Sequence, residues 1–131
     1  MSIEVPVPEL GDTLAHYPWG FLVTVRDDGR AQSVGVPTMW ADGVLHAEVG
    51  HSTAANMCAR PNVTLAFPGT SGEVYSLIVD GDATVSGNAC VITPTRAVLH
   101  ARRWAAPEVR RPLIGRRQVR RSTPKPRRNA S

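Results

Sequence analysis

The residues best suited to bind an anion stand together at the start of one predicted helix. The stretch EVGHSTAANMCARPNVTLAFP, residues 48–68, reads as a strand end, a short helix and a second strand. His51, Ser52 and Thr53 open that helix, where the backbone N–H groups have no helical partner and carry a partial positive charge. Such an opening is suited to hold a phosphate. The alternative is that Ser52 or Thr53 simply caps the helix.

The predicted phosphate site has no arginine or lysine of its own. Each charge-assisted hydrogen bond that is missing lowers the binding free energy by roughly 1.5–3 kcal/mol. Arg26, Arg30 and Arg60 are the cations that other segments offer, although Arg26 and Arg30 flank a turn, where a solvated role is the simpler interpretation. The sequence therefore predicts a weakened site.

The other reactive residues match no catalytic or metal-binding pattern. The four histidines (His16, His46, His51 and His100) form no helical pair, and the sequence contains neither a CxxC nor a G-x-S-x-G motif. We assign no catalytic residue and expect no metal. Cys58 and Cys90 are expected to be free thiols.

Strands joined by tight turns dominate the first hundred residues. GFLVTVRDDGRAQSVGV has Asp28-Gly29 between two extended runs, and PTMWADGVLHAEV repeats the pattern with Asp42-Gly43. Asp-Gly between apolar runs is a strong hairpin signal. The pattern predicts three or four consecutive strands arranged as an antiparallel meander.

Further strands follow the helix STAANMCAR, which Pro61 ends. They are NVTLAF, the long VYSLIVDGDATV with a bulge at Gly81, ACVI and TRAVLH. Residues 7–16 predict another short helix. Six or seven strands with one or two short helices indicate a mainly β fold, an antiparallel barrel that is closed or nearly closed. Trp19 and Trp40 are expected in the core or at an interface, with ring stacking as the alternative.

The charge distribution divides the chain near residue 100. Residues 1–100 carry four arginines and ten acidic residues, a net charge of −6, whereas residues 101–131 carry ten arginines and one lysine against Glu108. We expect one domain over 1–100 and a disordered tail over 101–131. The tail has three explanations: a nucleic-acid-binding arm, a solvated tail, or a frame-shifted reading of the gene's natural end.

The chain has no apolar run long enough for a membrane span and no basic N-terminal leader. We therefore expect a cytoplasmic protein.

The segments FLVTVRDDGRAQSVGVPTMWADGVLHAEV, ARPNVTLAFP and YSLIVDGDATV together resemble the pyridoxamine 5′-phosphate oxidase-like, FMN-binding split-barrel proteins. The resemblance covers roughly residues 10–100 and implies a split β-barrel. It also implies a homodimer that binds FMN, or the deazaflavin F420, in a groove between subunits. The segment ITPTRAVLH also resembles a segment of small actinobacterial members.

Carried over from this family, the strand along the cofactor ring is residues 33–38. The implied cofactor-binding residues are Ser33, Val34, Gly35, Val36 and Trp40 along the ring, and His51, Ser52, Thr53 and Asn56 near the phosphate. Family members have basic residues at the helix start, where this chain has serine, threonine and alanine. The resemblance predicts an oxidoreductase for a small organic substrate. The alternatives are a non-catalytic flavin-binding or degenerate barrel, and nucleic-acid binding through the tail.

Overall fold

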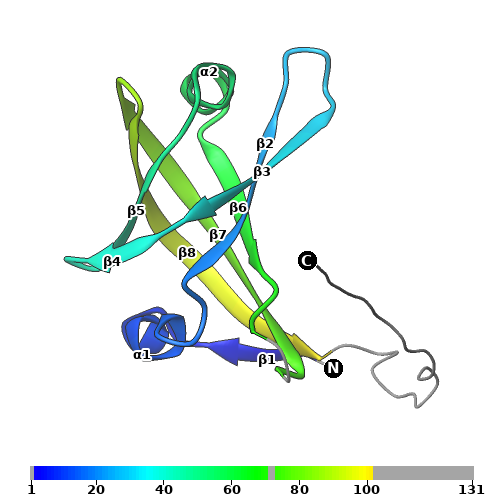
Figure 1. Cartoon of the computed structure of the whole chain (residues 1–131), viewed down its shortest axis with the longest axis vertical. Helices are drawn as coiled ribbons and strands as arrows, with labels where there is room; N and C mark the ends of the chain where they lie inside the picture. Colours follow the sequence, from blue (N-terminus) through cyan, green and yellow to red (C-terminus); the bar gives the residue numbers. More distant parts are fainter. Residues whose placement is uncertain (1, 71–72, 102–131) are drawn as a thin grey trace, which may run out of the picture. The chain divides into compact units, whose positions relative to one another are not determined.

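The computed structural model describes residues 2–70 and 73–101 (Figure 1). Their elements in chain order are β1 (Ser2–Val5), η1 (Val7–Glu9), α1 (Leu10–Leu14), β2 (Trp19–Val25), β3 (Ala31–Pro37), β4 (Met39–Ala41), β5 (Val44–Glu48), α2 (His51–Ala59), β6 (Asn62–Phe67), β7 (Tyr75–Ser86) and β8 (Ala89–Ala101). Apart from Ala101, which ends β8, the predicted tail lies outside the described residues.

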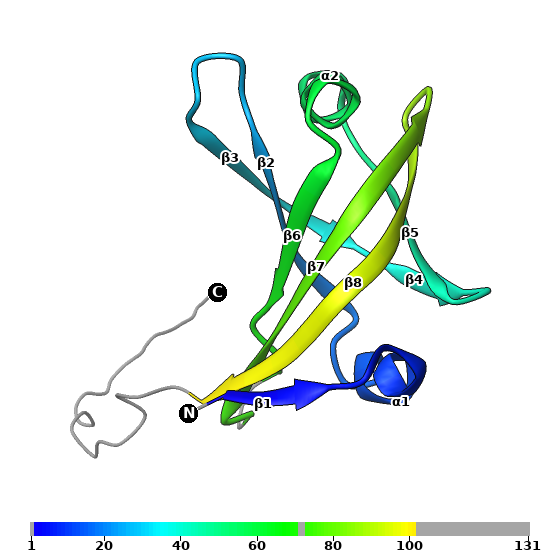
Figure 2. The ribbon, with the colours of Figure 1, turned by 180° about the vertical axis from the view of Figure 1, so that it is seen from behind.

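The strands form one curled antiparallel sheet, which confirms the predicted mainly β fold. Its order is β3-β2-β6-β7-β8-β5-β4, and β1 pairs with β8 outside this path. The sequence analysis missed β1, although its four residues alternate between polar and apolar, because so short a run gives only a weak strand signal. Figure 2 shows the long β7 and β8 running diagonally side by side, with α2 near their upper ends, β1 beside the lower end of β8, and α1 beyond β1.

The predicted meander is wrong beyond its two hairpins. The β2–β3 and β4–β5 hairpins form as expected, and glycines with positive φ lie in both turns, Gly29 at 86° and Gly43 at 78°. However, β3 and β4 lie at opposite edges of the sheet, although only Thr38 separates them in sequence. A tight turn fixes the pairing of the two strands it joins, but it does not fix how neighbouring hairpins are arranged.

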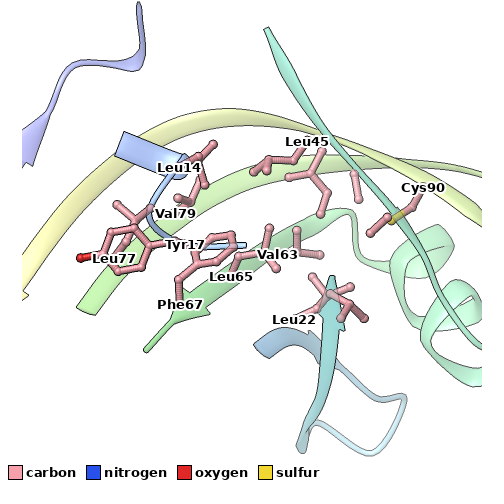
Figure 3. Packing of buried hydrophobic residues seen from close by; sticks show 14 of the residues in the cluster. Leu14, Tyr17, Leu22, Leu45, Val63, Leu65, Phe67, Leu77, Val79 and Cys90 are labelled. Atoms are coloured by element: carbon pink, nitrogen blue, oxygen red, sulfur yellow. The ribbon is translucent and has the colours of Figure 1, made fainter. Parts of the chain in front are cut away.

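The core lies on the concave side of the sheet (Figure 3). Leu22, Leu65, Phe67, Leu77 and Val79 are each 0% exposed. They alternate along β2, β6 and β7 with more accessible residues, as expected of strands with one buried face. Complete burial of each such side chain stabilises the fold by about 1.5–3 kcal/mol.

An irregularity beside Gly81 is found as predicted, but the extra residue is Thr95 of the opposite strand β8. The register between β7 and β8 shifts between Asp80 and Gly81, and Gly81 pairs with Pro94. Proline has no N–H to donate, so a bulge is one of the few places in a sheet that accepts it. The predicted segments ACVI and TRAVLH therefore join through Pro94 into the single strand β8.

Candidate functional site

Helix α2 begins without a side-chain cap. Its N-cap residue is Gly50, with φ −76° and ψ 174°, and no side chain there accepts a hydrogen bond from the helix N-terminus. His51, Ser52 and Thr53 are the first three helical residues. The alternative interpretation, that Ser52 or Thr53 caps the helix, is therefore wrong. The N–H groups of the first turn are left for another acceptor.

A chain of amide hydrogen bonds ties the start of α2 to β2 and β3. The Gln32 side-chain amide donates to Ser52 Oγ and to Thr53 Oγ1, both at 3.2 Å. Asn56 Nδ2 in turn donates to Gln32 Oε1 and to Thr24 Oγ1, both at 3.1 Å. The sequence analysis did not select Gln32 and Thr24. They face each other in the β2–β3 register, and the predicted hairpin turn would have placed them there.

These bonds determine what the two hydroxyls offer to a ligand. Because Ser52 and Thr53 accept hydrogen bonds from Gln32, neither hydroxyl proton is used in these bonds, and the exposed Ser52 hydroxyl can donate its proton to a ligand. Thr53 is 2% exposed and Asn56 8% exposed, so the support beneath the helix start is buried. The arrangement presents neutral donors and the partial positive charge of a helix N-terminus.

Two of the three arginines considered as charge donors are engaged elsewhere. Arg26 pairs with Asp28 at 2.8 Å inside its own hairpin. Arg60 pairs with Asp27 at 2.6 Å and also donates from Nε to the Val25 carbonyl at 2.8 Å. The side chain of Arg30 is exposed and forms no ion pair within the described part of the chain.

The residues predicted along the cofactor ring do not share one face. Ser33 and Gly35 are exposed on β3, whereas Val34 packs against the core and Val36 is 6% exposed. Trp40 lies on β4, half-buried and packed against the core. Strand alternation explains this division, since neighbouring residues point to opposite faces.

A cavity of about 610 Å³ lies beside the segment that leads into α2. Its walls are residues 37–39, residues 46–48 of β5 and residues 89–91 at the start of β8. His46 lines this cavity, and its Nε2 atom is buried without a hydrogen-bond partner among the described residues. A buried polar atom without a partner is costly, which marks a place where a ligand atom is expected. No sequence pattern had singled out His46 for this site.

Cys90, one of the residues that line the cavity, carries a buried thiol. Cys90 is 2% exposed and, like Cys58, is a free cysteine. Burial raises the pKa of the Cys90 thiol above its ordinary value of 9.0, and a backbone hydrogen bond with Ala47 acts in the opposite direction. The thiol is therefore neutral at physiological pH and unsuited to nucleophilic attack.

Within residues 2–70 and 73–101, no three His, Cys, Asp or Glu side chains are grouped so that they could hold a metal ion. None of the described helices has the length and apolar character needed to cross a membrane.

Comparison with curated proteins identifies two mycobacterial relatives. Uncharacterized proteins of Mycobacterium bovis and Mycobacterium tuberculosis are each 34% identical over 122 residues, covering 80% of this chain and 84% of each relative. The chain belongs to their family. No family model matches it.

Solved structures share the split-barrel fold. An F420 reductase superposes with a TM-score of 0.57 at 19% identity, covering 66% of this chain and 94% of that one. An FAD-binding protein of Mycobacterium smegmatis gives 0.55 at 17% identity, covering 75% and 95%. A haem-binding protein from the same organism gives 0.59 at 15% identity, covering 72% and 54%. The protein has the fold of the pyridoxamine 5′-phosphate oxidase-like split barrels, as its sequence predicts.

Proposed function

We propose that this split barrel binds a flavin-type cofactor, FMN or F420, and reduces or oxidises a small organic substrate. The observation that carries the proposal is the cavity at His46, whose buried and unpartnered Nε2 lies on the strand that leads directly into the uncapped start of α2. A largely apolar space beside a helix N-terminus suits a ligand that has a flat ring at one end and an anion at the other.

The residues present fit such a cofactor, with one difference from the predicted set. His51, Ser52 and Thr53 would receive the phosphate, while Asn56 and Gln32 hold the two hydroxyls in place. His46 and Thr38 would meet polar atoms of the cofactor in the cavity. The difference concerns the residues predicted along the ring. Ser33 and Gly35 are exposed on β3 and could contact the ring directly, whereas Val34, Val36 and Trp40 pack in or against the core and would support it from behind.

The bound cofactor would supply hydride chemistry, which needs no acidic or basic catalytic side chain from the protein. The barrel's contribution is to position the ring and exclude water through the apolar walls of the cavity. Since neither arginine nor lysine is among residues 51–55 at the start of α2, we expect phosphate binding to depend on uncharged hydrogen-bond donors. The affinity should therefore be about tenfold or more below that of a site with one additional arginine.

The proposal includes a cytoplasmic homodimer. Trp19 and Phe21 are each 42% exposed on β2, and their rings contact each other edge to face with centroids 5.1 Å apart. An exposed pair of large aromatic residues is suited to a contact with a second subunit. The free thiols Cys58 and Cys90 are compatible with a reducing compartment.

The test is titration of the purified full-length chain with FMN and with F420, followed by absorbance and flavin fluorescence. We expect saturable binding of one of them at micromolar concentrations. The double variant Ser52→Ala, Thr53→Val should weaken it at least tenfold, because it removes the exposed Ser52 donor to a charged phosphate and both hydroxyls that Gln32 holds. Ser86→Ala, at the exposed end of β7, is the matched control. If neither cofactor is taken up, the proposal is wrong.

Catalysis is tested separately on the loaded protein. Oxidation of NAD(P)H or of reduced F420 in the presence of an acceptor distinguishes an oxidoreductase from a barrel that only retains its cofactor. A chain that binds FMN but shows no turnover would support the non-catalytic alternative.

A haem is the second candidate ligand. His46 favours it, because a histidine side chain lining a largely apolar cavity could hold the iron of a haem. Titration with haemin distinguishes the two. A sharp Soret band that His46→Ala abolishes, together with no FMN uptake, would assign the cavity to haem.

A further inference from the structure

A second cleft adjoins the proposed cofactor cavity. It has a volume of about 360 Å³ and lies between α1, the loop before β2, and the β3–β4 connection. Thr38 and Met39 line both the cofactor cavity and this cleft. A molecule in the cleft would therefore lie next to a cofactor in the cavity, separated only by this short segment.

The walls of the second cleft carry no charge. Its nine lining residues include neither an acid nor a base. The Tyr17 hydroxyl, one of the few polar groups there, already donates to the Tyr75 carbonyl oxygen at 3.0 Å. In the adjoining cavity the acidic residue Glu48 is exposed. A phosphate or carboxylate in the cleft would find no cation to compensate for its lost hydration.

Besides the Thr38 hydroxyl, this apolar wall offers one side-chain hydrogen-bond donor that is not yet used, the indole N–H of Trp40. Its Nε1 atom lies against Gly11, where an added Cβ would be only 2.5 Å away, so glycine makes room for the ring. No described residue accepts a hydrogen bond from this nitrogen. It is also not sealed from solvent, since His46 Nε2 is the one buried, unpartnered side-chain polar atom among residues 2–70 and 73–101. Gly11 and Trp40 both line the cleft.

We propose that this cleft binds the substrate, and that the substrate is a neutral, planar carbonyl compound of the quinone class. Its ring lies between the apolar walls, and a carbonyl oxygen accepts a hydrogen bond from Trp40 Nε1. The role as substrate rests on the proposed function, whereas binding in the cleft does not. Reduction of a quinone would take one hydride from the reduced cofactor and one proton from solvent, giving the hydroquinone and the oxidised cofactor.

The binding test compares three probes on the full-length chain without cofactor, using isothermal titration calorimetry. Duroquinone is a neutral quinone that is fully substituted and does not add thiols readily, and durene is the same methylated ring without carbonyl groups. Pyridoxal 5′-phosphate is a planar carbonyl compound with a phosphate. We expect duroquinone to bind about fivefold more tightly than durene, the value of one hydrogen bond, and at least tenfold more tightly than pyridoxal 5′-phosphate.

Variants locate the binding site. Trp40→Phe removes the donor and should lower the affinity for duroquinone about fivefold more than the affinity for durene. Any change in the affinity for durene reports the altered packing alone. Gly11→Ala displaces the indole and should weaken both probes. Ile3→Val changes an exposed apolar residue on β1, away from the cleft lining, and should leave both affinities unchanged. Circular dichroism verifies that each variant is folded.

The outcomes separate this inference from the proposed function. FMN uptake without duroquinone binding, equal loss of both probes in Trp40→Phe, or preference for pyridoxal 5′-phosphate would each overturn the inference and leave the cofactor proposal intact. Duroquinone binding that depends on Trp40, without FMN or F420 uptake, would overturn the role as substrate together with the proposed function.

Discussion

At the scale of single residues, the site depends on amide side chains more than on charges. Gln32 and Asn56 use their donors and acceptors to link two strands to the start of α2. This arrangement fixes the orientation of Ser52 and Thr53 without a cation. Buried networks of this kind stabilise a structure when every member is satisfied, and they are costly to interrupt.

Asn56→Ala should lower the free energy of unfolding by about 1–3 kcal/mol, because it leaves Gln32 Oε1 without its donor and removes the donor to the buried Thr24 hydroxyl. Urea denaturation measures the change. Asn88→Ala, in the exposed β7–β8 turn, is the matched control and should stay within about 0.5 kcal/mol of the wild type. Equal effects in the two variants would contradict the network.

The two cysteines should differ in reactivity. Cys58 is exposed and should react with a thiol reagent in the folded chain, whereas Cys90 should react only after denaturation. In a Cys58→Ser variant only the buried Cys90 thiol remains, so the native variant should not react with the reagent. Rapid labelling of both cysteines in native protein would refute it.

The raised pKa of Cys90 also predicts a pH dependence. Below the unfolded value of 9.0 the thiol is protonated in both states, so its full contribution to stability is present. As the pH rises toward the higher folded pKa, the unfolded state releases the proton first, and the free energy of unfolding falls. Denaturation at several pH values should show this decline in the wild type and a smaller one in Cys90→Ala.

At the scale of elements, the bulge between β7 and β8 lets two long strands bend around the core. A Cβ at Gly81 would approach the Thr93 carbonyl oxygen to 2.7 Å, and this neighbour is backbone that cannot rotate away. Gly81→Ala should therefore cost about 1–3 kcal/mol of unfolding free energy, measured in urea. Gly35→Ala is the control, because its Cβ would meet only ordinary contacts at 3.7 Å or more. If Gly81→Ala left the free energy of unfolding unchanged, the two strands would not approach each other so closely at this position.

At the scale of the whole molecule, the exposed aromatic pair on β2 predicts association of two copies. Phe21→Asp places a charge in the proposed interface and should convert a dimer into a monomer, as measured by size-exclusion chromatography with light scattering. Ile3→Asp alters a similarly exposed apolar residue on β1, 44% exposed, and should leave the dimer intact. A wild-type chain that is monomeric at all accessible concentrations would contradict the prediction.

Local signals account for the parts of the fold that the sequence predicted. Asp28-Gly29 and Asp42-Gly43 specify their hairpins, Pro61 ends α2, and Gly81 marks the bulge. The same reasoning found the start of α2 but misjudged its cap. It also missed the Gln32 support and His46, since a glutamine or a histidine on a strand carries no distinctive pattern by itself.

The sequence alone determined which residues share a face of each strand and where the chain must turn, because alternation and turn chemistry act over a few residues. Only the tertiary structure decided that β3 and β4 lie at opposite edges of the sheet, that Gln32 meets Ser52 and Thr53, and that His46 Nε2 is buried. These arrangements depend on pairings between distant segments. Periodicity identifies a buried face, but it does not specify which other strand or helix covers that face.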